Sequence, residues 1–346
     1  MSDITLSLVV PCYNEESNVE AFCDEARRAL GDALYGWELV FVNDGSSDGT
    51  LERLRQLYAR RDENMTIVSF SRNFGKEAAM LAGLNRARGQ LMCIIDADLQ
   101  QDPAIARQMA DFLLEHEEYD CAAAYQAERI EGRFISACKK AFYGIINRIS
   151  EIEFRSGASD FRCFRRNVAD AVRALPEVSR FSKGIFSWVG FNTYYLPYTA
   201  RERNAGESKW GFFKLLRYAF DGILSYTTAP LKLATYLGGG SALLAVIYLI
   251  VVVLQRLIRG VDVPGYATIV VLILFLGGMQ LLILGIIGEY LARMYLQVKN
   301  RPVYIEKVFL QKDKSAPAAS GDSAAEADRS PASGRGPAPE PAGGAS

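Results

Sequence analysis

The sequence predicts an α/β domain with a mostly parallel sheet, followed by interfacial helices and two transmembrane helices. Within residues 1–205, short apolar runs alternate with stretches of helical periodicity, which is the pattern of a parallel sheet covered by helices. Beyond residue 232, two long runs contain no charged residue. These observations divide the chain into a globular domain and a membrane segment.

The expected strands of the globular domain are five short apolar runs. They are Ile4–Val10, Leu39–Asn43, Thr66–Phe70, Leu91–Ile95 and Cys121–Tyr125. Helical stretches such as Ser17–Leu30 and Thr50–Arg60 lie between them, and each opens with a Ser or Thr that could cap a helix. Because ligands of such sheets bind at the carboxyl ends of the strands, the residues that follow each strand are the candidate site.

Two uncharged runs, Leu233–Gln255 and Val263–Gly288, are each longer than the roughly 20 residues that a helix needs to cross a hydrocarbon core. Buried core helices are the alternative, but they rarely continue so far without a charge. We therefore predict two transmembrane helices with a short loop within residues 232–300. Basic residues flank the pair more densely than they occupy the loop. They are Lys209, Lys214, Arg217, Lys232, Arg293, Lys299, Arg301 and Lys307, against Arg256 and Arg259 in the loop.

This asymmetry of basic residues predicts the orientation of the chain. By the positive-inside rule, both termini and the globular domain lie in the cytoplasm, and the protein is a multi-pass protein of the inner (plasma) membrane. Residues 206–231 are aromatic and amphipathic, so we expect interfacial helices there. Residues 301–310 alternate like a strand that could pair with another chain and form a homo-oligomer. Residues 311–346 are expected to form a disordered tail without a catalytic role.

Composition excludes several classes of function. The chain has 39 Lys and Arg against 40 Asp and Glu, a balance unlike that of a nucleic-acid-binding protein. Its six cysteines contain no Cys-x-x-Cys pair, which argues against a zinc cluster or a disulfide framework. A transporter driven by ATP is disfavoured because the Gly-x-x-x-x-Gly-Lys-Ser/Thr loop is missing from the sequence. The chain has a single histidine, His116, which is too few for a histidine-based metal site, so any metal must be held by carboxylates.

Two carboxylates, Asp96 and Asp98, follow the expected strand in LMCIIDADLQQDP. In an extended chain, residues two apart lie on the same face. Paired carboxylates repel each other unless a cation lies between them, and Mg²⁺ or Mn²⁺ with oxygen ligands and substrate phosphates suits such a pair. The pattern is short, so a chance occurrence is the alternative.

Other charged residues admit two interpretations each. Glu15, Asp44 and Asp48 in VVPCYNEE and FVNDGSSDG could accept hydrogen bonds from a ribose or a base, or could serve only in turns and caps. The basic residues of ERIEGRFISACKKAFYGIINR could bind a phosphate at the membrane surface, or could line a solvated amphipathic helix. Those of TARERNAGESKWGFFK could bind a diphosphate.

Taken in order, the segments VVPCYNEE, VNDGSSDGT, SRNFGKEAA, DADLQQDP, SDFRCFRR and RERNAGESKW, with two C-terminal spans, resemble glycosyltransferase family 2. The resemblance covers roughly residues 4–310. It is closest to the polyprenyl-phosphate glycosyltransferases, the GtrB-like and dolichyl-phosphate mannose synthase-like branch. It implies a GT-A nucleotide-sugar-binding domain at residues 1–205 and the transfer of a sugar from a nucleotide donor to a lipid phosphate.

The resemblance also implies roles for individual residues. The residues expected to contact the nucleotide sugar are Pro11, Tyr13, Glu15, Asp44, Asp96, Arg201 and Lys209. The expected ligands of the metal, Mg²⁺ or Mn²⁺, are Asp96, Asp98 and Gln100. The residues expected to bind the acceptor phosphate are Arg129, Arg133, Lys139 and Lys140. Asp160 in SDFRCF stands where the family has its catalytic aspartate, and Asp98 is the second catalytic candidate.

The reaction implied is one inverting transfer, preferably of glucose from UDP-glucose to undecaprenyl phosphate, with a UDP donor favoured over a GDP donor. The Gln-x-x-Arg-Trp motif of processive members is missing, which favours a single transfer. A phosphate monoester has a second pKa of about 6 and is already an ionised nucleophile near neutrality, so we expect Asp160 to orient the acceptor or support the metal. Transfer to a carbohydrate hydroxyl and a non-catalytic membrane scaffold of the same fold are the alternatives.

Overall fold

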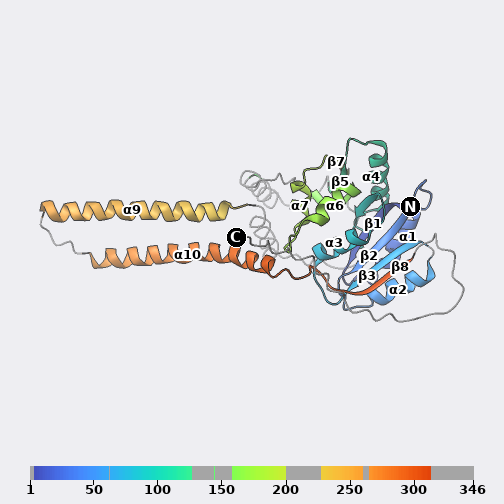
Figure 1. The fold of residues 1–346 in the computed structure, drawn as a ribbon, viewed down its shortest axis with the longest axis horizontal. Helices are drawn as coiled ribbons and strands as arrows, with labels where there is room; N and C mark the ends of the chain where they lie inside the picture. Colours follow the sequence, from blue (N-terminus) through green and yellow to red (C-terminus); the bar gives the residue numbers. More distant parts are fainter. Residues whose placement is uncertain are drawn as a thin grey trace, which may run out of the picture. The chain divides into compact units, whose positions relative to one another are not determined.

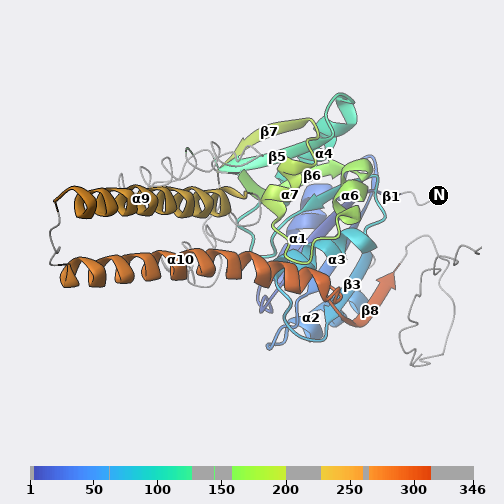
Figure 2. The same ribbon diagram turned by 60° about the vertical axis from the view of Figure 1, so that its left-hand side comes forward.

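The computed structural model describes residues 4–61, 63–126, 144, 158–199, 227–259 and 265–312. Its globular part is an α/β domain in which helices cover both faces of an eight-stranded sheet (Figures 1 and 2). The strand order across the sheet is β7-β5-β6-β4-β1-β2-β3-β8. The predicted fold class is confirmed.

All five predicted strands are present, with ends close to those expected. They are β1 (Ile4–Cys12), β2 (Gly36–Asn43), β3 (Asn64–Phe70), β4 (Leu91–Ile94) and β5 (Cys121–Gln126). β1 pairs in parallel with both β2 and β4, and β2 pairs in parallel with β3. The carboxyl ends of these four strands therefore lie along one edge of the sheet, where ligands of such folds bind.

Three more strands complete the sheet: β6 (Ala158–Arg165), β7 (Thr193–Tyr198) and β8 (Glu306–Lys312). β6 runs antiparallel to β4 and β5, whereas β7 runs parallel to β5. The antiparallel β6 enters the sheet directly beside β4, the strand that precedes Asp96. This placement brings a distant stretch of sequence to the carboxyl end of β4.

Helices form a layer on each face of the sheet. They are α1 (Val19–Leu30), α2 (Thr50–Arg60), α3 (Lys76–Arg86), α4 (Pro103–Glu115), α6 (Arg166–Ala174) and α7 (Ser182–Trp188). Leu8 and Phe41 pack in the core with α1, α2 and α4, whereas Val9 and Val40 pack with α3, α6 and α7. All four side chains are fully buried. Burial on both faces explains why these strands appear in the sequence as continuous apolar runs.

The predicted helix caps at Ser17 and Thr50 are wrong. Asn18 is the N-cap of α1 and Gly49 that of α2, and neither makes a side-chain capping bond. Thr50 is the first residue of α2, and its hydroxyl bonds to Asp48 and accepts from the Glu15 amide at 2.9 Å. These polar side chains therefore connect the loop after β1 to the loop after β2.

The strand predicted within residues 301–310 is β8, which begins at Glu306 and pairs with β3 of the same chain. Within the chain its partner is β3, and pairing with another chain stays a prediction. Arg86 on α3 forms an ion pair with Glu306 at 2.6 Å, which fixes the start of the strand. β8 covers the edge of β3 and is itself the last strand of the sheet, so the edge through which another chain would pair is the outer edge of β8.

Two long helices follow the globular part, α9 (Ala229–Arg259) and α10 (Tyr266–Val298). Within them, Ala229–Gln255 and Val271–Val298 are long and apolar enough to cross a membrane, each with a mean hydropathy of 2.5. Neither stretch is buried within the chain, which contradicts the alternative of two core helices. Most of the predicted interfacial segment 206–231, and the tail beyond Lys312, lie outside the described residues.

Candidate active site

The carboxyl ends of β1 and β2 form one polar junction. Asn14, with a positive φ of 56°, follows β1, and its side-chain oxygen accepts the amide of Ser47 at 2.9 Å. The amide of Asn14 in turn donates to the hydroxyl of Ser46 at 2.9 Å. The adjacent Tyr13 is 47% exposed and could lie against a flat ligand, as its predicted nucleotide contact requires.

Asp44 lies at the end of β2 and is 3% exposed. Its two carboxylate oxygens accept the amides of Phe74 and Gly75, at 2.6 and 2.9 Å. Burial raises its pKa, and these hydrogen bonds and Arg72 only partly offset that effect. Gly75 has a φ of 100°, which favours glycine, and it directly precedes α3. In this structure, Asp44 therefore holds the turn that leads into α3.

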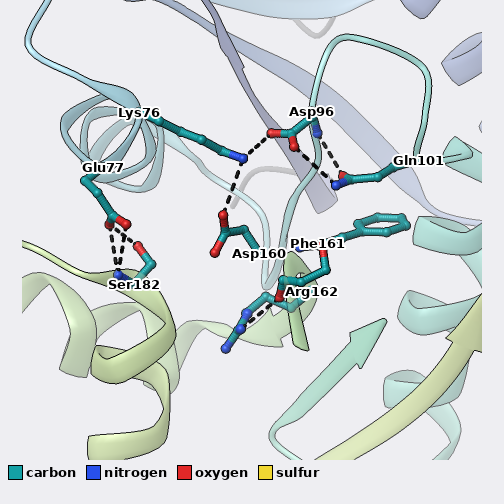
Figure 3. Close-up of polar contacts among 9 residues, drawn as sticks. Lys76, Glu77, Asp96, Gln101, Asp160, Phe161, Arg162 and Ser182 are labelled. Atoms are coloured by element: carbon teal, nitrogen blue, oxygen red, sulfur yellow. Dashed lines mark hydrogen bonds and ion pairs between the residues drawn. The ribbon is translucent and has the colours of Figure 1, made fainter. Parts of the chain in front are cut away.

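A lysine that sequence reasoning did not single out joins two of the predicted site carboxylates. The ammonium of Lys76, the first residue of α3, lies 2.6 Å from Asp96 Oδ1 and 3.4 Å from Asp160 Oδ2 (Figure 3). Asp96 follows β4 and Asp160 lies on β6, so three elements converge on one cation. The structure thus brings together Asp96 and Asp160, which are far apart in the sequence.

Asp160 is charged in this arrangement. Burial by itself would raise its pKa, but the positive charges of Lys76, Lys183 and Arg162 outweigh that effect and hold the pKa below its usual range. Burial would likewise lower the pKa of Lys76, yet Asp96 and Asp160 raise it well above the ordinary value. The second carboxylate oxygen of Asp160, Oδ1, is buried and has no hydrogen-bond partner among the described residues.

Asp98 lies in a turn and not on a strand. β4 ends at Ile94, and Asp98 accepts the backbone amide of Gln100 at 3.2 Å. Leu99, the next residue, has a positive φ of 60°. The extended conformation that we expected for Asp96 and Asp98 is therefore wrong, because the chain has already left the sheet. The turn still keeps both carboxylates at the carboxyl end of β4.

Gln101, and not Gln100, contacts the Asp96 carboxylate through its side chain. Gln101 Nε2 donates to Asp96 Oδ2 at 3.2 Å, and Gln101 Oε1 accepts the Asp96 amide at 3.0 Å (Figure 3). This pair of bonds orients the Asp96 carboxylate. The sequence DLQQDP has two adjacent glutamines, and nothing in it indicated which of them would point toward the site.

The described residues fit a divalent cation that completes its coordination with substrate phosphates. Among the described residues, the Asp96 carboxylate is bound by the flexible side chain of Lys76 and by the amide of Gln101, so a movement of the lysine alone would free an oxygen for a cation. Among the parts of the chain that the structure describes, no group of three His, Cys, Asp or Glu side chains forms a metal cage. Mg²⁺ commonly binds one or two carboxylates together with phosphates, so the donor set is appropriate.

Several predicted site residues lie outside the described residues. They are Arg129, Arg133, Lys139 and Lys140 for the acceptor phosphate, and Arg201 and Lys209 for the donor. Of the remaining predicted contacts, Pro11 lies at the end of β1 and Glu15 in the loop that follows. Both therefore lie on the ligand-binding edge of the sheet.

Comparison with known proteins assigns the chain to a family. The model of Glycosyl transferase family 2 matches residues 7–173, and that of the GtrB C-terminal hairpin matches residues 229–294. An uncharacterized glycosyltransferase of Synechocystis sp. is 42% identical over 303 residues, which cover 87% of this chain and 94% of the relative. The chain belongs to glycosyltransferase family 2. The predicted resemblance is confirmed, and the protein is a glycosyltransferase.

A second relative and a solved structure are also similar to this chain. The bactoprenol glucosyl transferase of Shigella phage SfII is 40% identical over 305 residues, which cover 87% of this chain and 97% of the relative. Among solved structures, glucosyl-3-phosphoglycerate synthase from Mycobacterium tuberculosis with Mn²⁺ and UDP-glucose is 19% identical. It covers 64% of this chain and 77% of its own, with a TM-score of 0.42, a likeness too distant to bear on ligands.

Proposed function

We propose that this glycosyltransferase transfers one sugar, glucose in the first instance, from a nucleoside diphosphate to the phosphate of a membrane polyprenyl phosphate. Undecaprenyl phosphate is the proposed carrier. The observation that carries the proposal is the 40% identity to a bactoprenol glucosyl transferase over both the globular domain and the helical hairpin. The two exposed apolar helices support it, because a membrane-held enzyme meets a lipid acceptor at the bilayer surface.

The reaction is a direct displacement at the anomeric carbon of the sugar. An oxygen of the lipid phosphate forms the new bond to this carbon, while the bond to the donor diphosphate breaks and its electron pair leaves with the nucleotide. Inversion of the anomeric configuration follows from a single displacement. The lipid phosphate is largely ionised near neutrality, so no proton has to be removed from the nucleophile.

The site residues supply charge and orientation for this displacement. A bound Mg²⁺ or Mn²⁺ would stabilise the negative charge that develops on the leaving diphosphate. Asp96 would hold this cation together with Asp98, and Gln100 is the third proposed ligand. Asp160 would orient the acceptor or support the cation site, in keeping with its ion pair to Lys76.

The remaining contacts are proposed from the family resemblance. Pro11, Tyr13, Glu15 and Asp44 would contact the nucleotide, for which UDP is preferred over GDP. Basic side chains would neutralise the phosphates of the two substrates. They are Arg201 and Lys209 for the donor, and Arg129, Arg133, Lys139 and Lys140 for the acceptor.

The proposal is tested with the full chain reconstituted into lipid bilayers that contain undecaprenyl phosphate. Labelled UDP-glucose, UDP-N-acetylglucosamine and GDP-mannose are supplied in turn, with Mg²⁺ or Mn²⁺, and label in the lipid fraction is measured. We expect lipid-linked glucose, and no product when the carrier or the cation is omitted. Label transferred only to an added carbohydrate would support the hydroxyl-acceptor alternative, and no transfer from any donor would support a scaffold.

A further inference from the structure

Lys76 fills the acidic site with a positive charge that belongs to the protein itself. Its ammonium binds Asp96 Oδ1 at 2.6 Å and Asp160 Oδ2 at 3.4 Å, and the Lys76 side chain is still 42% exposed. As the first residue of α3, Lys76 also lies where the helix dipole disfavours a cation. The two carboxylates therefore offset an unfavourable position, which indicates that the lysine is placed for the site and not for the helix.

The backbone around Lys76 is held from both sides. The preceding amide, that of Gly75, donates to Asp44 at 2.9 Å. The following residue, Glu77, accepts the Ser182 amide at 3.0 Å and also bonds to the Ser182 hydroxyl, which ties α3 to α7 (Figure 3). With the backbone fixed, only the flexible four-carbon side chain of Lys76 is left to move.

The ammonium and a metal ion cannot both occupy Asp96 Oδ1. A Mg²⁺ or Mn²⁺ ion binds a carboxylate oxygen at about 2.1 Å, so an ammonium 2.6 Å from the same oxygen would lie within a few ångströms of a divalent charge. At that separation, like charges repel strongly even at a protein surface. The metal must therefore displace Lys76 from Asp96.

Asp160 provides the place to which the ammonium moves. It lies within 3.4 Å of the ammonium already, and its buried Oδ1 has no hydrogen-bond partner among the described residues. A short movement of the Lys76 side chain would exchange its bond to Asp96 for a bond to this oxygen. Asp160 would then keep its counter-ion while Asp96 is released for the metal.

We infer that Lys76 is a resident counter-ion that competes with the divalent cation for Asp96 and so weakens metal binding to the donor-free enzyme. The inference rests on the proposed function in one respect, since it takes Asp96 as a metal ligand. The inference predicts that metal affinity depends on the positive charge of Lys76. Removal of the positive charge should tighten metal binding, whereas loss of a supporting residue would weaken it.

The test measures Mn²⁺ binding to the purified full chain without donor or acceptor, by electron paramagnetic resonance of the free ion. In K76Q and K76M we expect the dissociation constant to fall by about threefold to fivefold, the upper part of the range for a partly exposed ion pair. K76R, which keeps the charge, should stay within about twofold of the wild type. K307Q removes an exposed lysine of β8 and serves as the matched control.

The outcomes separate this inference from the proposed function. An unchanged or weaker Mn²⁺ affinity in both K76Q and K76M would overturn the inference, as would an equal gain in K76R. If the wild type bound no Mn²⁺ even with UDP present, the metal part of the proposed function would fail instead. The two neutral variants differ in polarity, so a folding defect in one, detected by its thermal unfolding, leaves the other to decide.

Discussion

Each carboxylate oxygen of Asp96 has a different partner. Lys76 binds Oδ1 and the amide of Gln101 donates to Oδ2, so one partner carries charge and the other fixes orientation. The first partner is the end of a long, partly exposed side chain, and the second is held by a return bond from the Asp96 amide. A cation can thus replace the lysine without disturbing the orientation of the carboxylate.

Replacing Gln101 should weaken metal binding. In Q101A, Asp96 loses the two bonds that orient it, and loss of such a supporting partner commonly costs about tenfold in metal affinity. We expect a tenfold rise in the Mn²⁺ dissociation constant, measured by calorimetry in the presence of UDP. Q100A is the comparison, and a loss in Q100A equal to or larger than that in Q101A would favour Gln100 as a direct ligand.

Replacing Asp160 tests whether it acts as a base. Because the nucleophile is already ionised, we expect D160N to lower kcat by no more than about tenfold, whereas loss of a general base would cost about a hundred- to ten-thousandfold. The measurement is the rate of lipid-linked product formation at saturating donor. D170N, on the exposed face of α6, is the control. A loss above a thousandfold would contradict the orienting role.

At the scale of elements, the antiparallel β6 decides which carboxylates meet. Its register pairs Leu91 with Arg165 and Ile94 with Arg162. Asp96 and Asp160 are each two residues from the pair Ile94 and Arg162, so both lie at the carboxyl end of β4. A shift of one residue would turn Asp160 to the other face of the sheet and away from Lys76.

The strand β8 has a comparable role at the other edge of the sheet. A chain that ends after Ile305 loses β8 and exposes the edge of β3, so we expect self-association and a lower unfolding temperature. A chain that ends after Lys312 keeps the strand and loses only the tail, and should keep full activity. Size-exclusion chromatography and thermal unfolding compare the two. Equal behaviour of both truncated chains would show that β8 does not protect this edge.

In the whole molecule, polar side chains of α10 contact the rest of the chain. Gln297 near the end of α10 donates to the Pro176 carbonyl at 2.7 Å and accepts the Val178 amide at 3.0 Å. The Tyr290 hydroxyl donates to the Thr227 carbonyl, just before α9, at 2.8 Å. These bonds connect α10 to the loop after α6 and to the start of α9.

The orientation in the membrane can be tested with reporter fusions. We expect a fluorescent protein fused after Lys312 to fluoresce and alkaline phosphatase fused there to be inactive, because the flanking basic residues favour a cytoplasmic location. Alkaline phosphatase inserted within residues 260–264 should be active. The reverse pattern would place the glycosyltransferase domain outside the cytoplasm and contradict access to a cytoplasmic nucleotide donor.

The fold class, the five core strands, the two apolar helices and the family could all be predicted from the amino-acid sequence. These features depend on local periodicity, on long uncharged runs and on ordered motifs, all of which are visible in one dimension. Asp96 and Asp160 were also identified as separate candidates, with no sign that both would bind one lysine.

How these residues combine depends on contacts between distant parts of the chain. The meeting of Asp96 and Asp160 depends on the register of β4 with β6, which joins segments about 64 residues apart in the chain. The placement of Lys76 depends on Asp44, which fixes the turn before α3 from a different strand. The same holds for β8, whose alternating pattern could not specify whether its partner is β3 of its own chain or a strand of another, because backbone pairing is independent of chain identity.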